Sequence, residues 1–125
     1  MGQGYLLDSN VIIDLIGKKL PIQTINVIGE NFMLSSDVSR IEVLGFSNSI
    51  EEEESFISFF SDLKILSLDE AVIQKSIQIR KQKRIKLGDA IIVATALVHN
   101  LKLITRNVVD FNGIDDLELI NSFPQ

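Results

Sequence analysis

A run of small and aliphatic residues in the last third of the chain constrains the fold most strongly. Between Leu87 and Val98 the one charged residue is Asp89. This length and composition predict a helix that is buried on nearly every side. Gly88 and Asp89 stand where that helix would begin, so the carboxylate faces the positive end of the helix dipole. From this run alone Asp89 is best interpreted as a cap, and any further role depends on whether other acids converge on it.

Short apolar runs alternate with helical patterns along the rest of the chain. The alternation predicts an α/β fold with a mostly parallel sheet covered on both faces. At 125 residues, the chain is expected to form one domain, 1–125. Strands are expected at residues 5–7, 31–35, 64–67, 102–105 and 116–120, the last at an edge of the sheet. Helices are expected at 11–16 and 21–28, from Ser36, after Ser49 and Ser67 with capping boxes to Glu52 and Glu70, and from Asp89.

Composition excludes several classes of protein. The chain has no Cys, so it has no disulfide and no thiolate metal site, which suits a reducing cytoplasmic location. The N-terminus does not resemble a signal peptide, and no apolar run is long enough to cross a membrane. The formal net charge of −5 argues against a general nucleic-acid binder. The charge is nevertheless sorted, with four acids at 51–54 and five of the twelve basic residues between Arg80 and Lys86.

Two acids follow predicted strands. Asp8 comes directly after residues 5–7, and Asp110 follows the strand at 102–105 after a Thr-Arg-Asn turn. In open parallel sheets ligands bind beyond the carboxyl ends of the strands, so these two side chains are expected at the binding edge. The alternatives are a helix cap for Asp8 and an ordinary loop position for Asp110.

Glu42 belongs to a different pattern, because it shares a helical stripe with Val38 and Phe46. A carboxylate flanked by apolar residues is expected to be at least half buried, which is costly unless it is paired or binds a metal. A salt bridge to Arg40 or Lys64, or a position at the rim of the stripe, stays open as an alternative. Asp14, among aliphatic residues, is interpreted as a structural or supporting acid.

If these acids cluster, they repel one another and raise their own pKa values. A hard dication removes that conflict, and a carboxylate cage without His or Cys suits Mg²⁺ or Mn²⁺. Such an ion also attracts an anionic phosphodiester, activates a water and stabilises the leaving oxygen.

Four segments together resemble the PIN domain, and in particular the VapC-type toxin ribonucleases of toxin–antitoxin pairs. The resemblance covers about residues 5–111. The segments are, in the family's order, Leu6-Leu-Asp8-Ser-Asn10-Val-Ile-Ile-Asp14, Ser39-Arg-Ile-Glu42-Val-Leu, Leu87-Gly-Asp89-Ala-Ile-Ile-Val-Ala-Thr-Ala96 and Leu103-Ile-Thr-Arg-Asn107-Val-Val-Asp110-Phe.

The resemblance implies an α/β/α sandwich with a five-stranded parallel sheet, and Mg²⁺- or Mn²⁺-dependent cleavage of single-stranded RNA. It also implies a homodimer that is silenced by a small antitoxin, which inserts a segment into the active-site groove. The residues that match the family's metal-binding and catalytic acids are Asp8, Glu42, Asp89 and the more variable Asp110. The residues that match polar positions lining the same site are Asn10, Thr105 and Asn107.

The sequence departs from the family pattern in two respects. Ser9 stands where Thr is more usual, which keeps the hydroxyl, and the net charge is acidic for a protein that binds RNA. The basic residues leading to Asp89 could track an RNA backbone, or could form a solvated helix end. The candidates for RNA contact are Arg80, Lys83, Arg84 and Lys86, with Arg106 after the fourth strand.

Two other functions compete with a ribonuclease. A non-catalytic RNA-binding or assembly module on the same fold is disfavoured because all four acids are present. A phosphoacceptor signalling domain needs an Asp after the third strand and a Lys after the last one. Here the third strand ends in Ser67-Leu68 and Lys102 precedes its strand, so this function ranks third.

Overall fold

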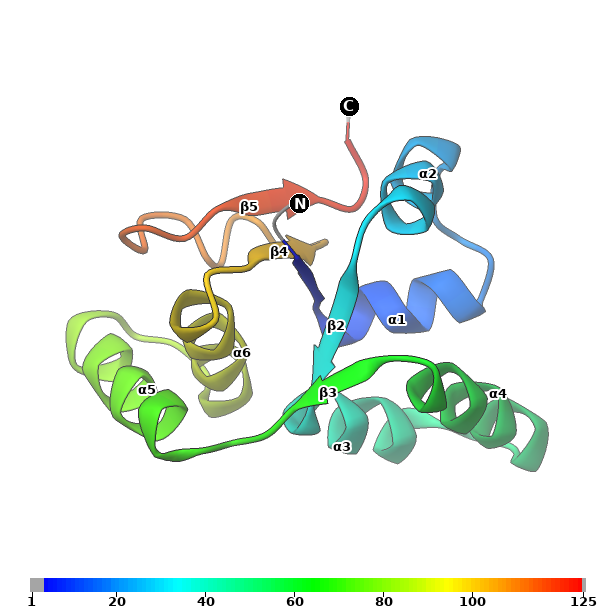
Figure 1. The fold of residues 1–125 in the computed structure, drawn as a ribbon, viewed down its shortest axis with the longest axis horizontal. Helices are drawn as coiled ribbons and strands as arrows, with labels where there is room; N and C mark the ends of the chain where they lie inside the picture. Colours follow the sequence, from blue (N-terminus) through cyan, green and yellow to red (C-terminus); the bar gives the residue numbers. More distant parts are fainter. Residues whose placement is uncertain (1–3, 125) are drawn as a thin grey trace.

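A five-stranded, fully parallel sheet organises the protein (Figure 1). The computed structural model describes residues 4–124. The strand order β3-β2-β1-β4-β5 confirms the predicted mostly parallel sheet of about five strands. The strands are β1 (Tyr5–Leu7), β2 (Met33–Ser36), β3 (Lys64–Leu66), β4 (Lys102–Thr105) and β5 (Leu119–Asn121).

Helices cover both faces of this sheet, as expected for an α/β/α sandwich. Figure 1 shows α5 and α6 together on one side of the sheet and α1, α3 and α4 on the other. The helices are α1 (Ser9–Ile16), α2 (Ile22–Glu30), α3 (Asp37–Phe46), α4 (Ile50–Ser61), α5 (Glu70–Gln82) and α6 (Leu87–Val98).

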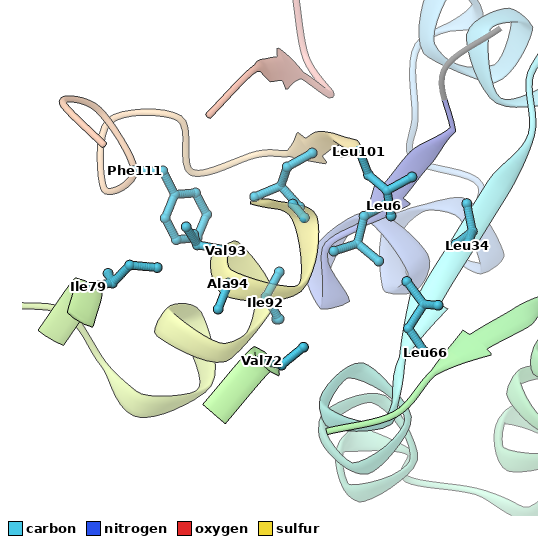
Figure 2. Close-up of a cluster of buried hydrophobic side chains, with 12 residues drawn as sticks. Leu6, Leu34, Leu66, Val72, Ile79, Ile92, Val93, Ala94, Leu101 and Phe111 are labelled. Atoms are coloured by element: carbon cyan, nitrogen blue, oxygen red, sulfur yellow. The ribbon is translucent and has the colours of Figure 1, made fainter. Parts of the chain in front are cut away.

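Alternation along the strands supplies two separate cores. Leu6 and Leu103, which are register partners, point toward α5 and α6, whereas their neighbours Leu7 and Ile104 point toward the helices of the opposite face. Figure 2 shows the first core, where strand leucines meet aliphatic side chains of α5 and α6. Six residues of α6 are buried, Ala90 and the run Ile92–Ala96, which confirms the prediction of a deeply buried helix. Within residues 4–124 no helix could cross a bilayer.

Local capping signals set most helix starts, with two corrections. Ser36 caps α3, and Ser49 caps α4 by accepting from Glu52 N–H at 3.1 Å, both as predicted. The α5 cap is Asp69 rather than Ser67, because Asp69 Oδ1 accepts from Val72 N–H at 3.0 Å. A capping box at Ser67 is therefore wrong. Asp89 lies inside the first turn of α6, and its N-cap position is Lys86.

The strand order has a topological switch point between β1 and β4, where the direction in which successive strands are added to the sheet reverses. β1 lies in the centre, with β2 and β3 added on one side and β4 and β5 on the other. At such a switch point, the loops beyond the carboxyl ends diverge and leave a crevice. Asp8 follows β1 here, and Thr105 ends β4 beside it.

Candidate active site

Asp8 is the buried centre of the site. Its backbone N–H donates to Ile104 O at 3.0 Å, which fixes the residue against β4. Its Oδ1 accepts from Ser9 N–H at 2.8 Å, and its Oδ2 accepts from the Thr105 hydroxyl at 2.6 Å. Burial raises the pKa of Asp8, the bonds from Thr105 and Ser9 oppose that rise, and the nearby Glu42 charge adds to it. Asp8 also caps α1, so the capping role and a place in the site coexist in one residue.

Glu42 reaches the same region from α3. Its Oε1 accepts a hydrogen bond of 2.6 Å from the Ser9 hydroxyl, which also lies 3.1 Å from Ser39 Oγ. Glu42 is exposed, and the predicted stripe of Val38, Glu42 and Phe46 is not the buried side of α3. The buried stripe of α3 runs through Ser39 and Val43, one position round the helix from the stripe that the sequence suggested. Within residues 4–124 Glu42 has no salt bridge, and Arg40 pairs with Asp37 instead.

Asp89 enters from the first turn of α6 and is partly buried. Burial raises the pKa of Asp89, and the charges of Asp8 and Glu42 raise it further, while Lys86 opposes the rise and Asp110 adds to it. Three other acids, Asp8 after β1, Glu42 of α3 and Asp110 after β4, therefore lie close enough to Asp89 to affect its pKa. The structure brings the four predicted acids to one edge of the sheet.

Gly88 explains how α3 and α6 approach each other at this point. A Cβ built on Gly88 would lie 2.9 Å from Glu42 Oε2. The missing side chain therefore leaves the space that the Glu42 carboxylate occupies beside the start of α6. In the sequence Gly88 is visible only as a helix-start signal, because its contact with Glu42 joins positions far apart in the chain.

The polar residues of the β4 loop connect to the acids in different ways. Thr105 is fully buried and bonds Asp8 directly, while its Oγ1 also accepts from Asn107 N–H at 3.1 Å. Asn10 Oδ1 accepts from Arg106 N–H at 3.4 Å. Thr105 is thus a positioning residue for Asp8, and Asn10 and Asn107 lie in the same loop network.

An ion pair between a half-exposed arginine and a buried aspartate lies beside the acids. Arg106 Nη1 donates to both carboxylate oxygens of Asp14, at 3.3 and 3.0 Å. The Asp14 side chain is 5% exposed, whereas that of Arg106 is 51% exposed. The pair ties α1 to the loop after β4, and the Arg106 charge opposes the rise in the pKa of Asp8. Only an apolar surrounding for Asp14 was visible in the sequence, and its partner is 92 positions away.

A cleft of about 540 Å³ opens beside Asp89 and Asp110. Its other lining residues come from the segment before α6 and from the β4 loop, namely Lys83, Arg84, Ile85, Lys86 and Val109. Three of the predicted RNA-contact residues thus lie next to the acids. Arg80 and Arg106 do not line this cleft, and Arg106 pairs with Asp14 instead.

The family of the chain follows from a sequence match. The family model described as "PIN domain" matches residues 5–116, which is most of the chain. The chain belongs to the PIN domain family. Among curated proteins none matches this PIN domain.

Solved structures similar to this PIN domain come from toxin–antitoxin complexes. A chain of the "Toxin-antitoxin complex from Klebsiella pneumoniae" is 28% identical with a TM-score of 0.79, and the alignment covers 97% of this chain and 99% of that one. A chain of VapBC2 from Rickettsia felis, bound to a DNA fragment from its promoter, is 24% identical with a TM-score of 0.79 over 94% and 98%. A chain of VapBC-1 from nontypeable Haemophilus influenzae is 22% identical with a TM-score of 0.79, and the alignment covers 94% of this chain and 97% of that one. The Rickettsia felis and Haemophilus influenzae chains are less than 25% identical to this one, so their similarity shows the fold alone.

The four candidate acids of this PIN domain offer oxygen ligands, which suit a divalent cation, but their side chains do not form a preformed metal site. Within residues 4–124, no three His, Cys, Asp or Glu side chains lie close enough together to bind one ion. Asp8 accepts hydrogen bonds from Thr105 and from Ser9 N–H, and Glu42 accepts one from the Ser9 hydroxyl. However, the candidate ligand atoms are all carboxylate oxygens, and two of these carboxylates, Glu42 and Asp110, are exposed to solvent. PIN domain nucleases generally use divalent metal ions.

Proposed function

We propose that this PIN domain is a metal-dependent endoribonuclease that cleaves single-stranded RNA and acts as the toxin of a cytoplasmic toxin–antitoxin pair. The observation that carries the proposal is the meeting of acids around Asp89, whose pKa is raised by burial and then by the charges of Asp8 and Glu42. Mutual repulsion of this kind disfavours the ionised set unless a cation joins it. The 28% identical chain from a toxin–antitoxin complex supports the biological setting.

Asp8, Glu42, Asp89 and Asp110 would hold Mg²⁺ or Mn²⁺. The bound ion would supply charge for the phosphate and a water of lowered pKa. The chain itself contributes the placement of the acids. Thr105 and Ser9 N–H orient Asp8, and the Ser9 hydroxyl holds Glu42 toward the start of α6. Each hydrogen bond to a carboxylate oxygen favours the ionised form, which is the form that a cation needs.

Arg106 is placed to contact the substrate backbone on the Asp14 side of the site. Its guanidinium is anchored by Asp14 but about half exposed, so a face of it stays available for a phosphate oxygen. Asn10 and Asn107 lie in the same loop network and would line the path of the strand. The proposed partners are therefore single-stranded RNA, a small antitoxin protein and a second copy of this chain.

Substitution of the central acid tests the proposal. Asp8→Asn should abolish Mn²⁺-dependent cleavage of a labelled single-stranded RNA while circular dichroism shows an intact fold. Asp115→Asn, which changes an exposed loop acid in the same way, is the matched control and should cleave like the wild type. Cleavage by the Asp8→Asn variant at the wild-type rate would refute the assignment. Arrest of growth on expression, relieved by co-expression of a short neighbouring reading frame, tests the toxin role.

One observation favours a second function, a non-catalytic RNA-binding or assembly module. Acidic side chains of the described residues do not form a ready three-ligand cluster. Isothermal titration with Mn²⁺ separates the two functions, since the module predicts no saturable binding and the nuclease predicts binding that Asp8→Asn removes.

A further inference from the structure

The charges of this protein are sorted in space as well as along the chain. The acids Glu51, Glu52 and Glu53 form the first turn of α4, and Glu51 and Glu52 line a hollow with residues of α1. The basic segment lies on the other side, between α5 and α6. A polyanion that reaches the acids from the α4 side meets repulsion, and one that reaches them from the α5–α6 side meets attraction.

The cleft beside Asp89 is lined by both basic and acidic side chains. On one wall are Lys83, Arg84 and Lys86, and on the other is the β4 loop with Val109 and Asp110. Among the described residues, none of the three cations forms an ion pair or a side-chain hydrogen bond. The nitrogen atoms of all three side chains are therefore available to contact a ligand. Lys86 lies near enough to Asp89 to oppose the rise in its pKa.

An apolar side chain completes the lip of the cleft. Val109 is 81% exposed, the largest exposed fraction among the large hydrophobic residues of the described chain. It stands directly before Asp110 and has no function in the core. A solvent-exposed aliphatic group beside three cations offers a van der Waals contact as well as charge, which suits a ligand with both phosphates and apolar surfaces, such as an unpaired nucleotide strand.

We infer that this cleft, which we call the basic cleft (Lys83, Arg84, Ile85, Lys86, Asp89, Val109 and Asp110), binds the phosphate backbone of single-stranded RNA on one side of the scissile bond. The inference rests on the proposed function. Lys83, Arg84 and Lys86 contact successive phosphates, and Val109 packs against a base or ribose. The strand leaves the acids over the α5–α6 side and avoids α4. Because the contacts are to phosphates, the cleft binds RNA with little sequence preference.

A charge-matched pair of variants tests the basic cleft. One variant carries Lys83→Gln, Arg84→Gln and Lys86→Gln. The control carries Lys18→Gln, Lys19→Gln and Lys75→Gln, which removes the same number of charges outside the cleft. Binding of a short fluorescein-labelled single-stranded RNA is measured by anisotropy in EDTA, so that metal-dependent cleavage does not interfere.

The cleft variant should bind RNA about tenfold or more weakly than the wild type, and the slope of log K against log salt should fall by about 2, because each phosphate contact on a single strand contributes about 0.7. The control should stay within about twofold of the wild type. Equal weakening in both variants, or none in the cleft variant, would overturn the inference.

A second measurement needs no variant and covers the case in which the substituted chain fails to fold. On adding the same RNA to the wild type, amide chemical shifts should change at residues 83–86 and 109–110, and not at 51–54. Changes confined to other surfaces would overturn the inference. Metal-dependent cleavage with an unused cleft would leave the nuclease proposal intact, whereas RNA bound in the cleft without cleavage would refute only the nuclease proposal. A wild type that neither binds nor cleaves RNA refutes both.

Discussion

Asp8 combines burial with a full set of donors. It is 4% exposed, and each of its oxygens accepts a hydrogen bond, one from the next residue and one from a hydroxyl 97 positions away. Desolvation favours the protonated acid and these donors favour the carboxylate. The balance decides the pH at which Asp8 becomes able to hold a cation.

Thr105→Val removes the hydroxyl with little change of shape. Because the Thr105 bond lowers the pKa of Asp8, its loss raises that pKa, and the acid limb of the cleavage-rate profile should move to higher pH. The free energy of unfolding should fall by about 1–3 kcal/mol, since a buried carboxylate oxygen loses its donor. Thr95→Val is the control, because Thr95 is also buried but bonds Ile91 O within α6. An unchanged acid limb in Thr105→Val would contradict the role given to this bond.

Gly88→Ala tests the space beside Glu42. An added methyl meets Glu42 Oε2 at 2.9 Å, so the exposed and flexible carboxylate must turn away. Stability should change little, because the gain of about 1 kcal/mol from Ala in a helix is offset by the loss of the Ser9–Glu42 hydrogen bond. Cleavage should fall if Glu42 holds the ion. Gly45→Ala in α3, where no atom lies within 4 Å, should gain stability and keep its activity. Full activity of Gly88→Ala would remove Glu42 from the site.

At the scale of elements, the site depends on how α1, α3 and α6 meet the sheet. Ser9 at the start of α1 bonds Glu42 of α3, and Gly88 lets α3 approach the start of α6. The Asp14–Arg106 pair adds a fixed link from α1 to the loop after β4. These contacts fix the positions of three helices and one loop around Asp8.

Arg106→Gln should therefore destabilise the protein by about 2 kcal/mol in urea unfolding, because it leaves the carboxylate of Asp14 buried without its partner. Half exposure of Arg106 keeps this below the cost of breaking a fully buried pair. Arg40→Gln is the matched control, since Arg40 and Asp37 are both exposed and 3.7 Å apart, and should cost less than about 1 kcal/mol. Equal effects of the two variants would show that the Asp14 pair is an ordinary surface contact.

At the scale of the whole molecule, the clustered acids oppose folding at neutral pH. The pKa values of Asp8 and Asp89 are raised above their ordinary value of 3.8 in the folded chain. As the pH rises above that value, the unfolded chain loses these protons first, so stability declines until the folded pKa values are passed. The folded state thus carries an electrostatic cost at pH 7 that a bound cation would relieve.

Asp8→Asn should raise the free energy of unfolding at pH 7, and this gain should shrink as the pH falls and disappear well below pH 3.8, where the wild-type acid is protonated in both states. Mn²⁺ should stabilise the wild type by about 2.7 kcal/mol at one hundred times its dissociation constant, and should have no such effect on Asp8→Asn. Urea unfolding at several pH values, with and without Mn²⁺, measures both effects. Asp115→Asn should behave as the wild type, and a pH-independent gain in Asp8→Asn would contradict this electrostatic account.

The sequence by itself determined the order and type of the elements. The predicted strands at 5–7 and 102–105 coincide with β1 and β4, and Ser36 and Ser49 cap the helices that they were expected to cap. These features depend on interactions within a few residues, and the sequence contains them in full. The choice between Ser67 and Asp69 failed because both positions offer a side-chain oxygen, and packing of α5 decided which one is used.

Only the tertiary structure decided which face of α3 is buried, and hence that Glu42 is exposed and reaches Ser9. It also decided that Asp14 meets Arg106 and that the cations before α6 share a cleft with Asp89 and Asp110. These partners are far apart in the chain, and the strand order 3-2-1-4-5 brings them to one edge. Local propensity places a side chain on its own element, whereas the packing of elements against the sheet determines which side chains meet.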